Sequence, residues 1–240
     1  MISSNNIKVG ISHGDPSGVG YEVILKTFQS KLMAEMCTPI IYGDKDALEL
    51  HQKTLKLDRV NVKHITDTSS AVSNSLNFIN CATEKRTFEI GTGTSESGKS
   101  ALEALNKAVD DLKNGLIDVL VTAPINKDNI QSEDFNFPGH TEFLASKDDK
   151  SKSLMFMVSD KLKVAVVTGH IPLSEISKQL NVEIIVEKIQ LMEKSLKNDF
   201  SIRKPKIAVL GLNPHAGDNG LLGKEDQEII VPAINDARTR

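Results

Sequence analysis

Short runs of β-branched residues alternate with segments of helical periodicity along the first half of the chain. Strands are predicted at residues 7–12, 39–42 and 117–122, and helices at residues 21–30, 44–55 and 98–113. A strand that leads through a helix into another strand forms a βαβ unit, in which the two strands are parallel. The alternation therefore predicts an α/β protein built on a parallel sheet.

The second half of the chain shows the same alternation. Apolar residues recur every three or four positions over residues 182–198, which predicts a helix. Apolar strands are predicted on either side of this helix, at residues 163–168 and 206–210. The α/β pattern therefore continues beyond the first half.

Two polar stretches interrupt the pattern. Residues 67–77 and 128–136 are rich in Ser, Asn and Asp and poor in periodic apolar positions, as surface connections are. We place a domain boundary in the second stretch, which gives a first α/β domain at residues 1–129 and a second at residues 130–240. A last helix is predicted at residues 224–238, so the chain is expected to stop within a helix.

The composition favours a protein that acts on small molecules. The chain has 240 residues, 39% hydrophobic, and its formal net charge of −3 provides no positive field that would attract nucleic acid or an anionic membrane. No apolar run approaches the roughly 18 residues of a membrane span, and no export signal is recognised at the start. Cys37 and Cys81 have neither CxxC nor zinc-ribbon spacing, which favours a reducing cytoplasm over a disulfide framework.

Four predicted strands end in turns that are rich in glycine, proline and polar residues. These turns lie at residues 14–20, 122–127, 169–173 and 211–217. In open α/β sheets, ligands bind beyond the carboxyl ends of the strands. The four turns are therefore the candidate functional site.

The first turn leads directly into a predicted helix. It contains Gly14, Asp15, Gly18 and Gly20, and free backbone N–H groups at the helix start would hold an anion or order a site. The glycine spacing is GxxxGxG rather than the dinucleotide motif GxGxxG, so a Rossmann fold is not predicted. The alternative is a tight connection in which glycine is needed for its backbone angles alone.

The other turns carry cationic and imidazole side chains. Asn126 and Lys127 follow the second strand end, where the ammonium group would bind a phosphate or carboxylate, although Lys127 alone is also typical of an ordinary surface. His170 and His215 each follow an apolar strand, and if those strands are parallel neighbours both imidazoles reach one crevice. Two such nitrogens begin a site for Zn²⁺, Co²⁺ or a related ion, which in a catalytic site has a third protein ligand and an open position.

A further segment contains His140 and Thr141. Apolar residues follow Thr141, which is therefore a candidate helix N-cap. The alternative is that the imidazole of His140 and the hydroxyl of Thr141 contact a phosphorylated substrate. His51 and His64 lie in ordinary polar or mixed surroundings and are left out of the predicted site.

Five segments together resemble the PdxA-type family of 4-hydroxythreonine-4-phosphate dehydrogenases. They read GDPSGVG at residues 14–20, TAPINK at 122–127, PGHTEF at 138–143, GHIPL at 169–173 and GLNPHAG at 211–217. Each segment alone is a weak signal, whereas five in the family's order are specific. The similarity extends from about residue 8 to the end of the chain.

The resemblance implies the fold of isocitrate and isopropylmalate dehydrogenases, with two α/β domains, an interdomain cleft and no Rossmann fold. It also implies a homodimer whose active site lies at the subunit interface. His140 and Thr141 match the family's substrate-contacting pair, and His170 and His215 match two of its three metal ligands. The implied reaction is oxidation of 4-phosphooxy-L-threonine, a small phosphorylated amino acid, with NAD or NADP and a divalent metal such as Zn²⁺, Co²⁺ or Mg²⁺.

The family continues past the matched region, with its third metal histidine and further substrate-binding residues. The chain is therefore expected to be truncated at its C-terminus. One alternative is a paralogue that oxidises another phosphorylated four-carbon hydroxy acid, of the threonate or erythronate type. The other is an inactive α/β binding module, if the natural protein ends at residue 240.

Overall fold

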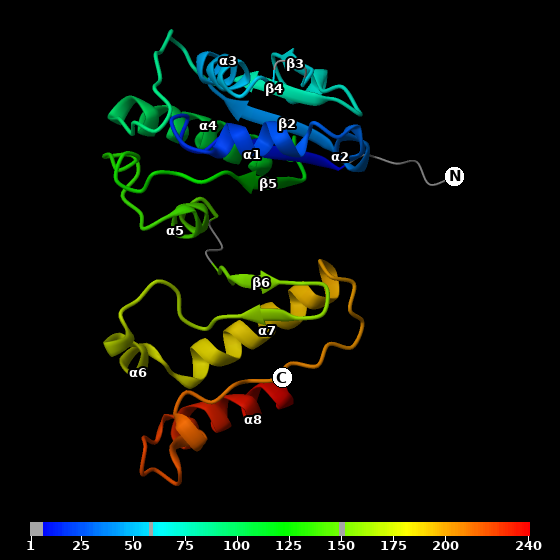
Figure 1. Cartoon of the computed structure of the whole chain (residues 1–240). Coiled ribbons are helices and arrows are strands. Elements are labelled where there is room, and N and C mark those ends of the chain that lie inside the picture. The colour runs from blue at the N-terminus through cyan, green and yellow to red at the C-terminus, as the bar shows by residue number, and fades with distance from the viewer. Residues whose placement is uncertain (1–6, 58–59, 149–151) are drawn as a thin grey trace. The chain divides into compact units, whose positions relative to one another are not determined.

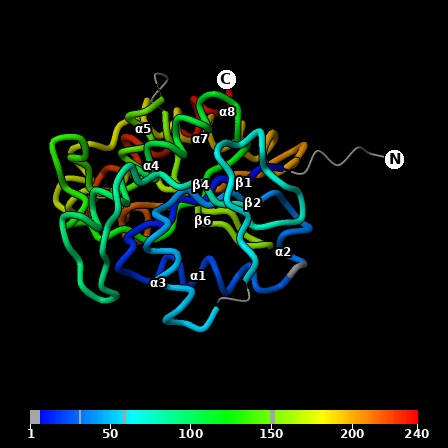
Figure 2. Tube along the Cα trace, turned by 90° about the horizontal axis from the view of Figure 1, so that it is seen from above, coloured from blue at the N-terminus to red at the C-terminus, as the bar shows by residue number. Residues whose placement is uncertain are grey.

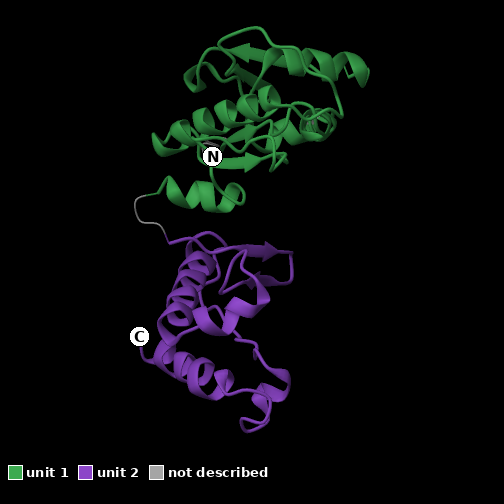
Figure 3. Cartoon of the chain, turned by 90° about the vertical axis from the view of Figure 1, so that its left-hand side faces the viewer, with its two compact units in different colours: residues 1–149 green, residues 150–240 purple. Residues whose placement is uncertain are grey.

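A computed structural model describes residues 7–57, 60–148 and 152–240 (Figure 1). The chain divides into two compact units, residues 1–149 and residues 150–240, which Figure 3 shows in different colours. Within the described ranges, no helix combines the length and the apolar character needed to cross a bilayer.

The first unit is built on a parallel sheet of five strands in the order β3-β4-β2-β1-β5. The strands are β1 (Lys8–Ser12), β2 (Thr38–Gly43), β3 (Val62–Ile65), β4 (Leu76–Asn80) and β5 (Val119–Thr122). β1 lies between β2 and β5, with Ile11 opposite Ile41 on one side and Val121 on the other. The predicted α/β fold with a parallel sheet is confirmed.

Helices cover both faces of this sheet. They are α1 (Gly20–Thr27), α2 (Lys31–Met36), α3 (Lys45–Thr54), α4 (Ser95–Lys113) and α5 (His140–Ser146), with a 3-10 turn at Thr68–Ser70. Every residue of β2 is buried, because successive side chains point to opposite covered faces. Ile41 packs with Leu25 of α1 and Leu48 of α3, whereas Ile40 packs with Ala104 of α4. Figure 2 shows α1 and α3 on one side of the strands and α4 on the other.

The second unit combines a two-stranded antiparallel sheet with packed helices. Its elements are β6 (Phe156–Val158), β7 (Lys163–Ala165), a 3-10 turn at Leu173–Glu175, α6 (Ile176–Gln179), α7 (Val182–Asn198), a 3-10 turn at Pro214–Gly217, a π-helical turn at Asp226–Ile230 and α8 (Val231–Thr239). α7 has the bounds that its periodicity predicted, and the Asn181 side chain caps it by accepting a hydrogen bond from Ile184 N at 2.9 Å. The core of the unit includes Ile185 of α7, which packs with Ile230 and Ala233.

The two units divide between residues 149 and 150, not between residues 129 and 130 as predicted. Phe135 and Phe143 are fully buried and pack with Leu105 of α4, so the segment that carries them belongs to the first unit. This packing was not predicted, because the apolar residues around Phe135 and Phe143 follow neither the helical nor the strand period.

One predicted surface connection is part of the sheet. Asn77, assigned to a polar stretch, lies in β4 and is fully buried, and its amide donates a hydrogen bond to the carbonyl oxygen of Pro39 at 3.1 Å. A buried polar side chain is tolerated where its hydrogen bonds are made. β3 and β4 were not predicted as strands, because the residues that flank them are polar.

The strands predicted in the second unit also differ from the structure. Residues 206–210 form no strand with any described residue. β7 pairs antiparallel with β6, because a tight turn, closed by a 2.8 Å hydrogen bond from Ser159 N to Leu162 O, reverses the chain between them. The premise that parallel neighbouring strands carry His170 and His215 is therefore not met in the described residues.

Candidate functional site

The turn at residues 14–20 joins β1 to α1 and packs against the segment that follows β5. The backbone N–H of Asp15 donates a hydrogen bond to the carbonyl oxygen of Pro124 at 2.8 Å. Gly14 has a φ of 74°, and a Cβ atom on it would lie 2.3 Å from the same oxygen, so a side chain does not fit there. The Asp15 carboxylate accepts a hydrogen bond from Ser17 N at 2.9 Å. Gly14 and Asp15 thus hold the turn in shape.

The other two glycines of the turn allow close approach of the backbone. Gly18 N donates a hydrogen bond to the Asp15 carbonyl at 3.0 Å. A Cβ atom on Gly20 would lie 2.1 Å from the carbonyl oxygen of His13. The contacts therefore account for the glycine spacing as a compact connection between strand and helix, and anion binding by this turn stays a prediction.

The rings of His13, Tyr21 and His51 pack together next to this turn. This cluster was not predicted from the sequence. His13 stacks on Tyr21 with ring centroids 5.1 Å apart, and the Tyr21 ring lies 5.4 Å from that of His51. His51 is 1% exposed, contrary to the polar surroundings assigned to it, and its Nε2 lies 2.8 Å from the carbonyl oxygen of Pro16 in the turn. The available signal was its position three residues after Leu48, on the apolar face of α3.

A buried ion pair completes this cluster. The Tyr21 hydroxyl donates a hydrogen bond to the backbone carbonyl of Asp44 at 2.8 Å. Arg86, whose side chain is 3% exposed, donates two hydrogen bonds to the Glu103 carboxylate, at 2.7 and 2.9 Å, and lies 3.7 Å from the Asp44 carboxylate. Burial raises the pKa of Asp44, whereas the hydrogen bond to Glu103 raises the pKa of Arg86. The ring cluster next to the turn is therefore held by hydrogen bonds and by a buried ion pair.

Stability of the first unit should depend on pH through His13. Burial lowers the pKa of His13 from 6.5 to about 3. The unfolded chain therefore binds more protons between these two values, and the free energy of unfolding falls as the pH is lowered through this window, by up to about 1.4 kcal/mol per pH unit. We expect His13→Phe to remove this contribution, which urea denaturation followed by circular dichroism at several pH values would measure. His64→Phe, in an exposed position of β3, is the control; equal slopes for wild type and His13→Phe would contradict the argument.

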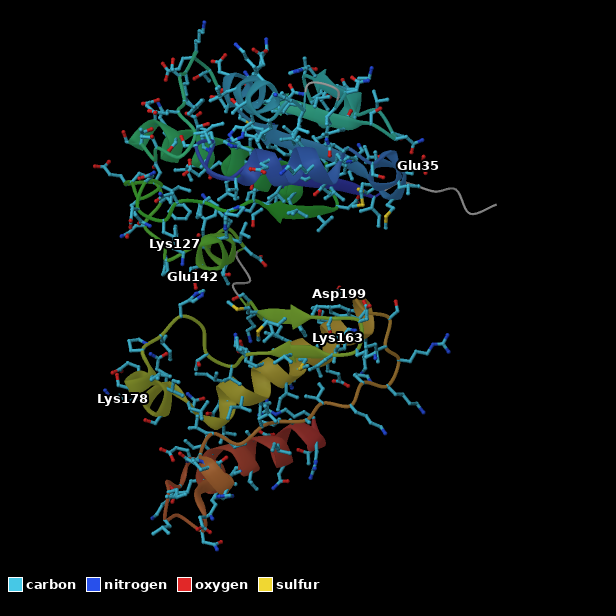
Figure 4. All side chains as sticks on the ribbon, viewed as in Figure 1. Glu35, Lys127, Glu142, Lys163, Lys178 and Asp199 are labelled. Carbon is cyan, nitrogen blue, oxygen red and sulfur yellow. The ribbon has the colours of Figure 1, made fainter. Side chains whose placement is uncertain are left out.

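The structure brings Lys127 close to the segment that carries His140. The side chain of Asn126 accepts hydrogen bonds from the backbone of Asp128 and Asn129 at 3.0 and 3.2 Å, so it shapes the turn after β5 and leaves Lys127 exposed. A Cβ atom on Gly139 would lie 3.9 Å from Lys127 Cε. Figure 4 shows Lys127 and Glu142 on neighbouring elements of the first unit. An ammonium group is thus available beside the start of α5.

His140 is the first residue of α5 and is half-buried. Its Nε2 atom is buried and makes no hydrogen bond, and burial lowers its pKa. An unpaired buried nitrogen is unfavourable unless a ligand completes it. Thr141 follows within the helix, and the N-cap is Gly139, so the N-cap role predicted for Thr141 is wrong. Phe143, buried in the core of the first unit, fixes the helix.

His170 and His215 are exposed side chains of the second unit. His170 lies between β7 and the 3-10 turn at Leu173–Glu175. His215 lies in a backbone segment that is entirely left-handed: every residue from 215 to 220 has a positive φ, including His215 at 52° and Ala216 at 53°. Left-handed geometry in non-glycine residues is unfavourable and concentrates at functional sites.

The donor chemistry of these two histidines fits a divalent ion. Neutral imidazole suits Zn²⁺ and Co²⁺, whereas Mg²⁺ prefers oxygen ligands and water. Among the residues that the structure describes, no group of three or more His, Cys, Asp or Glu side chains is arranged to hold a metal ion. His170 and His215 would therefore supply part of a ligand set.

Comparison with known protein sequences gives consistent matches. A family model described as pyridoxal phosphate biosynthetic protein PdxA matches residues 35–240. The chain is 48% identical over 236 residues to the 4-hydroxythreonine-4-phosphate dehydrogenase of Bacteroides thetaiotaomicron, covering 98% of this chain and 65% of that protein. It is 36% identical over 233 residues to a protein of Oceanobacillus iheyensis named "Putative D-threonate 4-phosphate dehydrogenase", covering 95% of this chain and 70% of that protein.

The same fold occurs in solved structures. The chain is similar to the crystal structure of 4-hydroxythreonine-4-phosphate dehydrogenase from Klebsiella pneumoniae, with a TM-score of 0.87 and 27% sequence identity. The match covers 99% of this chain and 72% of that one. The chain therefore spans between 65% and 72% of the length of these three relatives.

Proposed function

Because the chain belongs to the PdxA family of pyridoxal phosphate biosynthetic proteins, we propose that it acts as the dehydrogenase of 4-phosphooxy-L-threonine, which is 4-hydroxythreonine 4-phosphate. The substrate's secondary alcohol gives a hydride to NAD⁺ or NADP⁺ and a proton to solvent. The product is 2-amino-3-oxo-4-phosphooxybutanoate, a β-keto acid that loses CO₂ to form 3-amino-2-oxopropyl phosphate. That amine would enter the synthesis of pyridoxine 5'-phosphate.

The observation that carries this proposal is the 48% identity, over 98% of the chain, to a relative with this enzyme name. The structure supports it at His140, where a half-buried imidazole has an unpaired Nε2. We assign this nitrogen and the hydroxyl of Thr141 to the substrate, with the Lys127 ammonium group nearby for the phosphate. Fixing the phosphate orients the alcohol for reaction.

We assign His170 and His215 to a divalent ion, with Zn²⁺ or Co²⁺ preferred over Mg²⁺ by their imidazole nitrogens. When bound, such an ion supplies Lewis acidity that stabilises negative charge on the substrate, while the nicotinamide cofactor accepts the hydride.

The setting of the reaction is also part of the proposal. We place it in the cytoplasm, since Cys37 and Cys81 are both free thiols. We expect a homodimer with the active site at the subunit interface, as the resemblance to the PdxA family implies.

A second candidate substrate is D-threonate 4-phosphate. It is favoured by the 36% identity to the Oceanobacillus relative that carries its name. The two substrates share the phosphate and the oxidised alcohol and differ in the group next to the carboxylate, an amine in one and a hydroxyl in the other. Steady-state kinetics with both compounds separates the candidates, because the preferred substrate has the larger kcat/KM.

We expect His140→Ala to raise KM for the phosphorylated substrate by about 10–100-fold, because a hydrogen bond to a charged group contributes about 1.5–3 kcal/mol. NADH formation with added Zn²⁺ or Co²⁺ would measure this effect. The assay would use the 240-residue chain and the same chain fused to the part of the Bacteroides relative beyond the match, so that all regions of the family are represented.

His64→Ala is the matched histidine control and should keep the wild-type KM, because His64 lies in the edge strand β3. Absence of activity with both substrates in the fused form would overturn the proposed function in favour of a binding module. A normal KM in the His140→Ala variant would overturn only the role assigned to His140.

A further inference from the structure

The left-handed segment around His215 requires something that holds it. Four of its residues, His215, Ala216, Asp218 and Asn219, are not glycine and have φ between 45° and 55°. Each such residue disfavours the conformation, so the segment persists only where surrounding contacts impose it. Exposed side chains such as that of His215 do not provide these contacts.

Two carboxylates at the start of the last helical segment hold the residues that lead into the left-handed segment. Asp226 is 3% exposed, and its two carboxylate oxygens accept hydrogen bonds from the backbone N–H groups of Leu212, at 3.0 Å, and Asn213, at 2.9 Å. The Glu225 carboxylate accepts a hydrogen bond from the Asn213 side-chain amide at 2.8 Å. Leu212 and Asn213, just before Pro214, are therefore hydrogen-bonded to the helix through their backbone N–H groups. The side chain of Asn213 adds a third bond.

The packing around these bonds leaves little freedom. A Cβ atom on Gly211 would lie 2.9 Å from an oxygen of Asp226, and a Cβ atom on Gly217 would lie 2.2 Å from the carbonyl oxygen of Gly223. The segment thus enters and leaves the left-handed turn at two points of close contact. A larger residue at Gly217 would require a shift of the backbone, and one at Gly211 would displace the Asp226 carboxylate.

The helix that carries Asp226 is itself fixed in the core of the second unit. Ile230, one turn further along, is buried and packs with Ile185 and Val186 of α7. Asp226 is therefore held in place by a packed helix, and its hydrogen bonds fix the loop relative to that helix.

We infer that Asp226 is a positioning residue for His215, one that orients the imidazole for a divalent ion without contacting the ion. This inference rests on the metal role proposed for His215. A carboxylate is suited to the task because it has two acceptor oxygens for two neighbouring N–H groups. An amide in its place has one acceptor oxygen, and its NH₂ group would face a donor.

Asp226→Asn tests the inference, with Asp236→Asn as the control. Asp236 is a carboxylate of α8 that is paired only with Arg240 among the contacts seen for it. Co²⁺ affinity of the chain fused to the remaining part of the Bacteroides relative would be measured by calorimetry and by the visible spectrum of bound Co²⁺. Hydrogen exchange of the Leu212 and Asn213 amides, without metal, would measure the loop itself.

We expect Asp226→Asn to weaken Co²⁺ binding about 10–100-fold and to speed exchange at the two amides, with Asp236→Asn unchanged in both. Asp226→Glu keeps the carboxylate and should recover most of the affinity. If Asp226→Asn does not fold, Glu225→Ala, which removes only the bond to the Asn213 side chain, should still weaken Co²⁺ binding. Glu225→Ala without effect would then overturn the inference.

The failures are distinguishable. Faster amide exchange in Asp226→Asn with wild-type Co²⁺ affinity would overturn the positioning role and leave the proposed function intact. Absence of Co²⁺ binding by the unmutated fused form would reject the metal role of His215, and the inference with it.

Discussion

His215→Ala should lower kcat/KM for NADH formation by about 10³-fold, because the charge stabilisation that a bound ion supplies amounts to several kcal/mol. The assay would use the fused form and saturating Zn²⁺ or Co²⁺. Co²⁺ binding by the same fused form should fall in parallel. His170→Ala should have a similar effect, and the double variant should be little worse than either single one, since ligands of one ion act as a unit.

The control for this series is again His64→Ala, which removes an imidazole from the edge strand β3. Its kinetics and Co²⁺ affinity should match those of the wild type. Retention of both by His215→Ala would show that the left-handed turn does not serve a metal ion.

The largest expected effect on stability is that of Phe143→Ala. Phe143 is fully buried, with its ring 5.1 Å from that of Phe135 and 5.6 Å from that of Phe137. Removing such a ring leaves a cavity, and we expect the free energy of unfolding of the first unit to fall by about 3–5 kcal/mol. The chain contains no tryptophan, so urea denaturation would be followed by circular dichroism.

Hydrogen exchange would assign this loss to a unit. Amides of α4, which packs with Phe143, should lose protection, while those of α7 in the second unit should keep it. Loss of protection in α7 with α4 unchanged would contradict the placement of Phe143 in the first unit. Phe200→Ala is a matched control, because Phe200 belongs to the second unit and pairs with Phe156.

The sequence was sufficient for the elements with a regular period. Residues 182–198 form a helix with the predicted bounds, and β1 and β2 coincide with the short segments at residues 7–12 and 39–42 that were predicted as strands. The position of β5, next to β1 rather than β4, does not follow from period alone. It depends on which strands pair although they are far apart in the sequence, and the hydrophobic pattern of each strand does not specify its partner.

The site residues stay predictions. The motifs pointed to His140, and the structure shows that its buried Nε2 makes no hydrogen bond. The contacts of His51 and Asp226 were not predicted, because each is made to a backbone atom distant in sequence: His51 to Pro16, and Asp226 to Leu212 and Asn213. A hydrogen bond to a backbone atom does not depend on the side chain at the contacted position, so residue types do not reveal it.

The place of β1 in its sheet, between β2 and β5, affects how the chain folds during synthesis. β1 pairs with β5, and the backbone N–H of Lys8 donates a hydrogen bond to the Asp118 carboxylate at 2.7 Å, across 110 positions of sequence. Contacts of such long range slow folding. One edge of β1 must therefore stay unpaired until β5, at Val119–Thr122, has emerged from the ribosome, and during that interval it is open to strands of other nascent chains.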